Sequence, residues 1–120
     1  IRVVTVHDSG RILHPALARS QVTGGVVMAA GYALFEHYPV PDGLPESLDF
    51  DRYRIPRFGD IPLIDVYFHE SKSQFGPHGA KGLGEPAMLA TAPALISALQ
   101  DATGRSLSQL PVLPTLTRDS

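Results

Sequence analysis

The longest helical pattern in this chain lies between about Ala16 and about His37. Apolar residues recur there at spacings of three, four and seven, which predicts one long helix; they are Leu17, Val22, Val26, Val27, Ala30, Ala33 and Leu34. Residues 39–49, which follow, contain three prolines and a glycine and therefore predict an exposed connection. The sequence thus predicts one dominant helix that ends at a loop.

Three glycines lie inside that helical pattern, at positions 24, 25 and 31. Each glycine destabilises a helix interior by about 1 kcal/mol relative to alanine. Gln21, Gly24 and Gly31 fall near one face of the helix, because offsets of three and ten residues return to a similar direction. A face of small residues that carries one amide invites close contact, either with another helix or sheet or with a ligand.

Two strands and a second helix complete the predicted fold. Residues 3–6 are β-branched and precede a turn, and residues 62–68 form a second apolar run, whereas residues 70–79 predict a polar loop. A helical stripe runs from Met88 to Leu99 and ends at Thr103-Gly104. Pro93 predicts either a kink or a restart with Thr91 as the cap. The tail, with Pro111 and Pro114, is expected to be extended. The expected class is α+β, with two main helices packed on a small sheet.

Composition excludes several classes of function. The 120 residues carry 12 acidic and 10 basic side chains, a balance that predicts neither nucleic-acid nor membrane binding. There are no cysteines, so a zinc ribbon or iron–sulfur ligation within the chain is excluded. No apolar run reaches the roughly 18 residues of a membrane helix. No signal peptide stands at the start, so a cytoplasmic location is expected. The five histidines show no metal-ligand spacing, and no protein-ligated metal is predicted.

The string Gly79-Ala80-Lys81-Gly82-Leu83-Gly84-Glu85-Pro86 is the strongest candidate for a site. Pro86 suits the first position of a helix, which places Glu85 at or just before a helix N-terminus. A carboxylate is favoured there by the helix dipole alone, so Glu85 is either a structural acid or a general base in a concave site. The string is neither a dinucleotide fingerprint, because no strand directly precedes it, nor a phosphate-binding P-loop, because Lys81 is not followed by Ser or Thr.

Read in order, several strings resemble the C-terminal portion of the molybdenum-binding subunit in the xanthine dehydrogenase / aldehyde oxidase family (molybdenum hydroxylases). The ordered set covers nearly the whole chain. Its members are Val6-His7-Asp8-Ser9-Gly10-Arg11-Ile12-Leu13-His14-Pro15, Gln21-Val22-Thr23-Gly24-Gly25, Tyr53-Arg54-Ile55-Pro56, Asp60-Ile61-Pro62, Gly79 to Pro86, Ala92-Pro93-Ala94 and Leu110-Pro111.

The resemblance implies a role for each matching residue. Glu85 would be the base at a molybdenum–pterin centre that hydroxylates aldehydes or aromatic N-heterocycles with oxygen from water. Gln21 would contact the pterin. The other cofactor-binding residues implied are Gly24, Gly25, Lys81, Gly82 and Gly84.

The resemblance also implies what lies outside the 120 residues. Residues 1–120 would be a single partial domain, and the strand-like start at Ile1 without an initiator Met predicts a portion of a longer polypeptide. The remainder of the molybdenum subunit would be one partner, and iron–sulfur clusters, with or without FAD, would lie on other domains or subunits. Neither turnover nor tight cofactor binding is expected of this fragment alone.

Two positions depart from the family pattern. His14 stands where the family commonly has Asn, and Thr23 stands where it often has Glu. Two rival hypotheses stay open. The chain could be a non-catalytic binding module whose glycine-rich surfaces pack against a partner protein, or a small standalone domain that has kept the motifs without the reaction.

Overall fold

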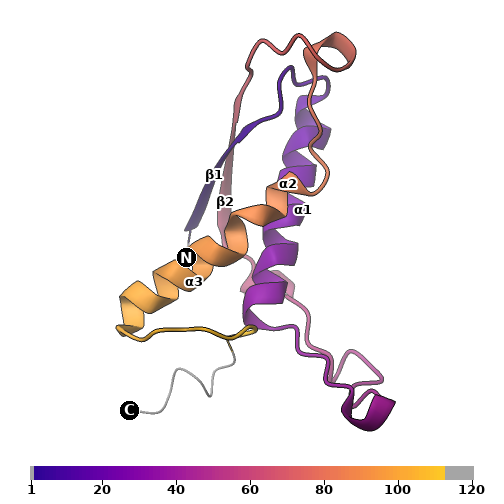
Figure 1. Cartoon of the computed structure of the whole chain (residues 1–120), viewed down its shortest axis with the longest axis vertical. Helices are drawn as coiled ribbons and strands as arrows, with labels where there is room; N and C mark the ends of the chain where they lie inside the picture. Colours follow the sequence, from indigo (N-terminus) through magenta and orange to yellow (C-terminus); the bar gives the residue numbers. More distant parts are fainter. Residues whose placement is uncertain (1, 113–120) are drawn as a thin grey trace.

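The computed structural model describes residues 2–112; Ile1 and Pro114, which the sequence places in a strand and in an extended tail, lie outside that range. Figure 1 shows one long helix beside two strands, with a second helix set at an angle. The elements in order are β1 (Arg2–Asp8), α1 (Pro15–Leu34), β2 (Leu63–His69), α2 (Pro86–Leu89) and α3 (Thr91–Thr103), with short 3₁₀ turns at Pro41–Gly43, Phe58–Asp60 and Pro77–Gly79.

The two strands form a parallel two-stranded sheet in which Arg2 pairs with Leu63 and Asp8 with His69. Parallel pairing needs a crossover connection, which α1 supplies. The α+β class, with two helices on a small sheet, is confirmed, but the sequence did not predict the parallel direction. Alternate residues face opposite sides. Val66 on the inner side is buried against α1, whereas Val6 on the outer side is 66% exposed.

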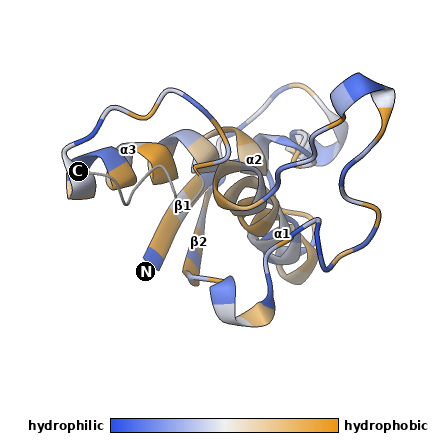
Figure 2. Cartoon of the chain, turned by 90° about the horizontal axis from the view of Figure 1, so that it is seen from below, coloured by the Kyte–Doolittle hydropathy of each residue, from blue (hydrophilic) through white to orange (hydrophobic). Residues whose placement is uncertain are grey.

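The core is small and has two parts, both built on α1. Near the sheet, Val22 and Val26 are fully buried and pack with Val66 and Ala87. Toward the other end of the helix, Ala29 and Ala33 pack against Ala92 of α3. Figure 2 shows the hydrophobic residues gathered where the strands, α1 and α2 meet, while the outlying loops are largely hydrophilic.

The ends of α1 have clear physical causes. Pro15 occupies the first helical position, and the Nδ1 atom of His14 accepts a hydrogen bond of 3.2 Å from the backbone N–H of Leu17. His14 is therefore the N-cap, a role that Asn also fills well. The helix ends at Leu34, three residues before the predicted end. Phe35 leaves the helical conformation, and its N–H and that of Glu36 both bond to the carbonyl of Gly31.

Between α2 and α3 the chain restarts its helix and does not kink. Pro93 is the third residue of α3, where a backbone N–H has no partner within the helix. The predicted cap was wrong: Ala90 is at the N-cap, and Thr91 is the first helical residue, its buried hydroxyl donating to the carbonyl of Ala87. Gly104 ends α3 where the sequence predicted, and it adopts the left-handed conformation.

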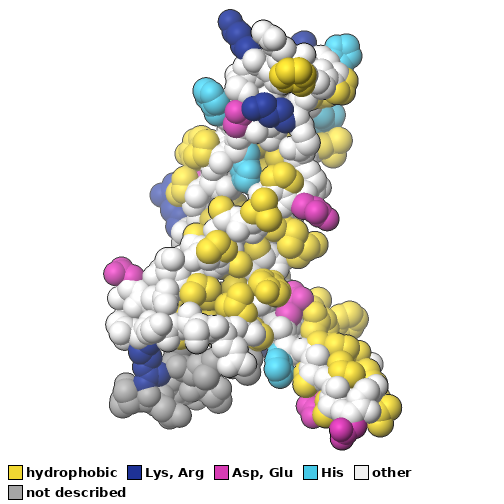
Figure 3. Space-filling view, in the orientation of Figure 1, with side chains coloured by type: hydrophobic (Ala, Val, Ile, Leu, Met, Phe, Trp, Pro, Cys, Tyr) yellow, Lys and Arg dark blue, Asp and Glu magenta, His cyan; other side chains and the backbone are white. Residues whose placement is uncertain are grey.

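The molecule is elongated, with extents of 50 × 35 × 25 Å and a radius of gyration of 17.2 Å. A compact domain of this length has a radius of gyration of about 14 Å. Residues 37–56, which we call the arm, project from the end of α1 (Figures 1 and 3). On the arm, Leu48 is 78% and Phe50 is 71% exposed. Within residues 2–112, no helix is both long enough and apolar enough to cross a membrane.

Candidate functional site

A groove runs along α1 on the side that faces the start of α2. It encloses about 730 Å³. Its lining residues are Leu17, Ser20, Gln21, Gly24, Gly25, Met28, Gly84, Glu85 and Met88. Four of them form a stripe along α1, because positions 17, 21, 24 and 28 are spaced by three or four residues and so share one face. The groove therefore has one wall from α1 and one from the loop that carries Glu85.

One hydrogen bond joins these two walls. The side-chain amide of Gln21 donates to the backbone carbonyl of Gly84 over 2.8 Å, between positions that are 63 residues apart in the sequence. The bond fixes the loop against the helix one residue before Glu85. It brings two separately predicted strings, the one with Gln21 and the one with Glu85, into one site.

Glu85 lines this groove. It occupies the N-cap position of α2, and Pro86 is the first helical residue, so the predicted placement is confirmed. Its side chain is exposed and makes no capping hydrogen bond. A capping acid would bond to the backbone N–H groups of its own helix. The Glu85 carboxylate is therefore available to a ligand in the groove.

The glycines of α1 serve three different purposes. Gly24 lines the groove, and a Cβ atom added there would meet nothing within 4 Å. Gly25 allows helix packing, because a Cβ added there would lie 2.7 Å from the Cβ of Ala87. Gly31 sits elsewhere, against Pro56 of the arm. Of the three residues predicted to share a face, Gln21 and Gly24 line the groove and Gly31 does not. Both predicted uses of the small residues occur, since Gly25 contacts another helix and Gly24 borders the open groove.

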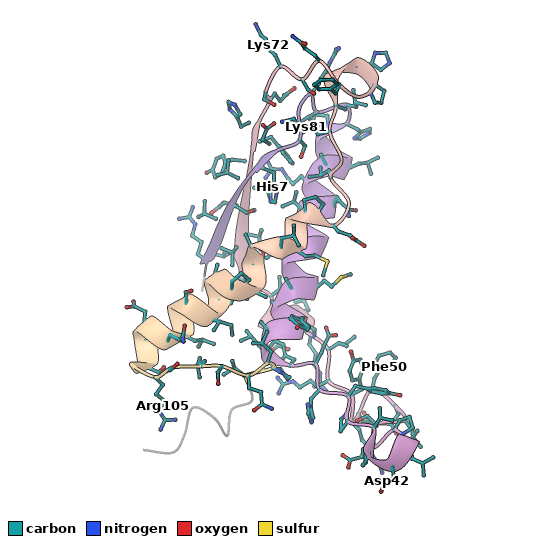
Figure 4. The ribbon with its side chains drawn as sticks, in the orientation of Figure 1. His7, Asp42, Phe50, Lys72, Lys81 and Arg105 are labelled. Carbon is teal, nitrogen blue, oxygen red and sulfur yellow. The ribbon has the colours of Figure 1, made fainter. Side chains whose placement is uncertain are left out.

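Lys81 and Gly82 do not line this groove. The Lys81 ammonium lies 2.8 Å from Oδ2 of Asp8, at the end of the molecule where β1 ends and α1 begins (Figure 4). Together with hydrogen bonds from Gly10 and Ser71, this contact holds the pKa of the Asp8 carboxyl well below its usual range. A cofactor contact from Lys81 or Gly82 stays a prediction. From the sequence alone, Asp8 was expected only to form a turn with Ser9 and Gly10.

The hollow between α1 and α3 lacks the chemistry of a catalytic site. A cavity of about 610 Å³ between α1 and α3 is lined by largely apolar side chains and has no acid or base among them. Within residues 2–112, no three His, Asp or Glu side chains gather as metal ligands. Leu17, Met28 and Met88, which line the groove, were not among the site residues predicted from the sequence. Leu17 and Met28 lie four and seven residues from Gln21, and this helical spacing could have identified both of them as groove residues.

The structure is thus a piece of an α+β domain in which a glycine-lined helix faces an unpaired carboxylate across a groove. Residues 1–62 match the molybdopterin cofactor-binding domain family. The chain belongs to that family.

Curated relatives show which larger proteins contain such a piece. The chain is 37% identical over 115 residues to the putative xanthine dehydrogenase molybdenum-binding subunit XdhA of Escherichia coli K12, covering 94% of this chain and 15% of that protein. It is 36% identical over 114 residues to the aldehyde oxidoreductase molybdenum-binding subunit PaoC of the same strain, covering 92% of this chain and 16% of that protein. The chain therefore spans about 15% of the length of these relatives.

Solved structures share the fold. Quinoline 2-oxidoreductase from Pseudomonas putida 86 superposes with a TM-score of 0.86 at 28% identity, over 93% of this chain and 15% of that one. Aldehyde oxidoreductase from Desulfovibrio gigas superposes with a TM-score of 0.83 at 25% identity, over 93% of this chain and 12% of that one. The relatives are thus oxidoreductases of the molybdenum hydroxylase family, and this chain matches a small part of their large subunit.

Proposed function

We propose that this chain is the C-terminal portion of the molybdenum subunit of a hydroxylase, in which it supplies the catalytic base and one wall of the cofactor site. The parent enzyme would act on an aldehyde or an aromatic N-heterocycle. When bound, the molybdenum–pterin cofactor supplies the electron acceptor for a hydroxylation whose oxygen comes from water. The chain's own contribution is Glu85 on one wall of the groove and Gln21 with Gly24 on the other.

The groove fits such a group. A flat, polar ring system needs a surface without side-chain obstruction, and Gly24 leaves the middle of the α1 wall open. The amide of Gln21 is held at the same wall by its bond to Gly84, which leaves its oxygen free to accept a hydrogen bond. The methionine side chains 28 and 88 add apolar surface beside these polar groups.

Glu85 has what a general base needs. It must reach the proton that it takes, and its carboxylate lines the groove and is not engaged in capping its helix. Its position is restrained, because Gly84 is bound to Gln21 and Ala87 is buried against α1. A carboxylate oxygen of Glu85 would receive the proton released as the substrate is hydroxylated.

The single observation that carries this proposal is the hydrogen bond between Gln21 and Gly84. It places the glutamine and the glutamate strings on opposite sides of one groove, although they are far apart in sequence. A binding module that only kept the motifs would need no carboxylate directed at an open groove.

The test is Glu85→Gln in the complete enzyme, with Glu46→Gln on the arm as the matched control. Turnover of benzaldehyde and xanthine and the molybdenum content of the purified enzyme are measured. We expect Glu85→Gln to lose turnover by about 100- to 10,000-fold, the contribution typical of a positioned general base, while its molybdenum content stays that of the wild type. Wild-type turnover in Glu85→Gln would overturn the catalytic assignment.

The same proposal includes the partners and the location of the parent enzyme. The rest of the molybdenum subunit would close the groove, and subunits or domains with iron–sulfur clusters, with or without FAD, would carry electrons away. A cytoplasmic location is also part of it. A preparation of the complete protein that contains neither molybdenum nor pterin would favour the non-catalytic binding module instead.

A further inference from the structure

We infer that Asp8 is a positioning residue for Glu85, acting through Lys81 on the loop that carries the glutamate. The inference rests on the proposed function of Glu85. Asp8 is the last residue of β1 and touches neither the groove nor Glu85. It would act by fixing the start of the loop, whereas Gln21 fixes its end.

Asp8 joins three segments of the chain with its two carboxylate oxygens. Oδ2 accepts from the Lys81 ammonium at 2.8 Å. Oδ1 accepts from the hydroxyl of Ser71 at 2.8 Å and from the backbone N–H of Gly10 at 3.0 Å. The end of β1, the residues after β2 and the glycine-rich loop are therefore tied at one point.

The backbone around this point is also paired. The N–H of Lys81 donates to the carbonyl of Ser9 at 2.8 Å, and the N–H of Arg11 donates to the carbonyl of Gly79 at 2.9 Å. Ser9 and Gly10 are buried, and Gly10 has a φ of 60°. A side chain at position 10 would overlap the Gly79 carbonyl oxygen, so only glycine fits.

The loop between Lys81 and Glu85 is thus held at both ends. Leu83, in the middle, packs against the core cluster of Val22 and Val26. Gly82 and Gly84 alone would leave this stretch free to move, since glycine adds conformational freedom. A misplacement of about 1 Å in a catalytic group can lower the rate by about 100-fold, so the anchor at Asp8 bears on catalysis although it lies outside the groove.

The experiment is a double-mutant cycle in the complete enzyme with Asp8→Asn, Lys81→Met and the double variant. Asn has the shape of Asp and keeps an acceptor for Gly10 and Ser71, so Asp8→Asn removes mainly the attraction to Lys81. Asp65→Asn is the matched control, because Asp65 forms the other ion pair of the sheet, with Arg2 on its outer face. Turnover of benzaldehyde or xanthine, molybdenum content and hydrogen–deuterium exchange of residues 79–85 are measured.

We expect each single variant to lower kcat by about 10- to 100-fold with little change in KM. The double variant should lose no more than a single one, because both changes remove the same interaction. Exchange in residues 79–85 should speed up in all three variants and stay at the wild-type rate in Asp65→Asn. Molybdenum content should remain that of the wild type in all of them.

Three results would overturn the inference. One is unchanged kcat and exchange in Asp8→Asn and Lys81→Met. Another is a kcat loss that multiplies in the double variant. The third is a loss of molybdenum in Lys81→Met alone, which would make Lys81 a direct cofactor contact. The proposed function fails separately: if Glu85→Gln retains turnover while exchange still speeds up in Asp8→Asn, the anchor exists but the glutamate is not the base.

Discussion

Gly25 of α1 lies so close to Ala87 of α2 that a Cβ added to the glycine would stand 2.7 Å from the alanine Cβ. This contact sets the distance between the two walls of the groove, since Ala87 follows Glu85 by two residues. The neighbouring Gly24 faces open space. Two adjacent glycines in one helix therefore have opposite structural roles.

We therefore expect opposite results from the same substitution at these two positions. Gly24→Ala should raise the free energy of unfolding by about 1 kcal/mol, because alanine is the better helix residue. Gly25→Ala gains the same propensity, but its overpacking against Ala87 costs about 1–3 kcal/mol and pushes α2 outward. Chemical unfolding of the complete subunit measures both. Equal effects at both positions would contradict the packing seen here.

Gly24→Ala should also separate stability from cofactor binding. Its methyl group would enter the groove, where a ligand is proposed to approach the helix backbone. We expect a subunit that unfolds later than the wild type and yet contains less molybdenum. Molybdenum analysis of the purified enzyme gives the measurement. A full molybdenum content would mean that the cofactor does not approach α1 at this residue.

Gln21 provides a third prediction. Gln21→Glu replaces the donating amide with a carboxylate oxygen, which would face the carbonyl oxygen of Gly84 and repel it. Gln21→Ala removes the bond without adding repulsion, and it should lower the free energy of unfolding by about 1 kcal/mol. Molybdenum content should therefore fall further in Gln21→Glu than in Gln21→Ala. Arg19→Ala on the same helix but outside the groove is the control, and equal molybdenum contents in all three variants would count against the site.

The sequence predicted the elements that depend on local signals. The placement of Glu85 before Pro86 and the end of α3 at Gly104 follow from preferences of single residues within one turn of helix. The small-residue face of Gln21 and Gly24 follows from helical spacing. These features needed no knowledge of the rest of the fold.

What the sequence could not predict depends on contacts between distant segments. The ion pair of Asp8 with Lys81 joins positions 73 apart, and the parallel direction of the sheet depends on how α1 crosses back over it. The end of α1 was predicted three residues too late, because Gly31 accepts two hydrogen bonds that turn the chain toward the arm. Nothing in the local pattern of residues 35–37 signals that turn.

A comparison of Gly10 with Gly43 tests whether the contact between Gly10 and the Gly79 carbonyl oxygen stabilises the fold beyond the effect of a positive φ. Both have a positive φ, which costs a non-glycine residue roughly 1–2 kcal/mol. Only at Gly10 would an added Cβ also overlap another group, the Gly79 carbonyl oxygen. Gly10→Ala should therefore lower the free energy of unfolding clearly more than Gly43→Ala, and it should speed hydrogen exchange in residues 79–85. Equal losses would show that conformational strain alone explains the preference for glycine.

The base of the arm is held by a hydrogen bond of 2.8 Å from the Tyr53 hydroxyl to a carboxylate oxygen of Glu36. This bond, with some loss of solvent and the charge of Glu36, raises the pKa of Tyr53 above its usual value. Because the folded-state pKa is the higher one, the bond's contribution to stability is complete below the unfolded pKa of about 10. It is lost as the pH rises through the folded-state pKa.

Glu36→Gln should therefore bring the pKa of Tyr53 back toward its usual value, because the amide carries no charge. Titration by absorbance, with Tyr53→Phe to assign the signal, measures the shift. The same titration in Glu46→Gln should match the wild type, since the structure shows no bond between that arm carboxylate and Tyr53. The stability difference between wild type and Glu36→Gln should narrow only at alkaline pH. A Tyr53 pKa that is unchanged in Glu36→Gln would mean that the arm is not anchored to α1 through this bond.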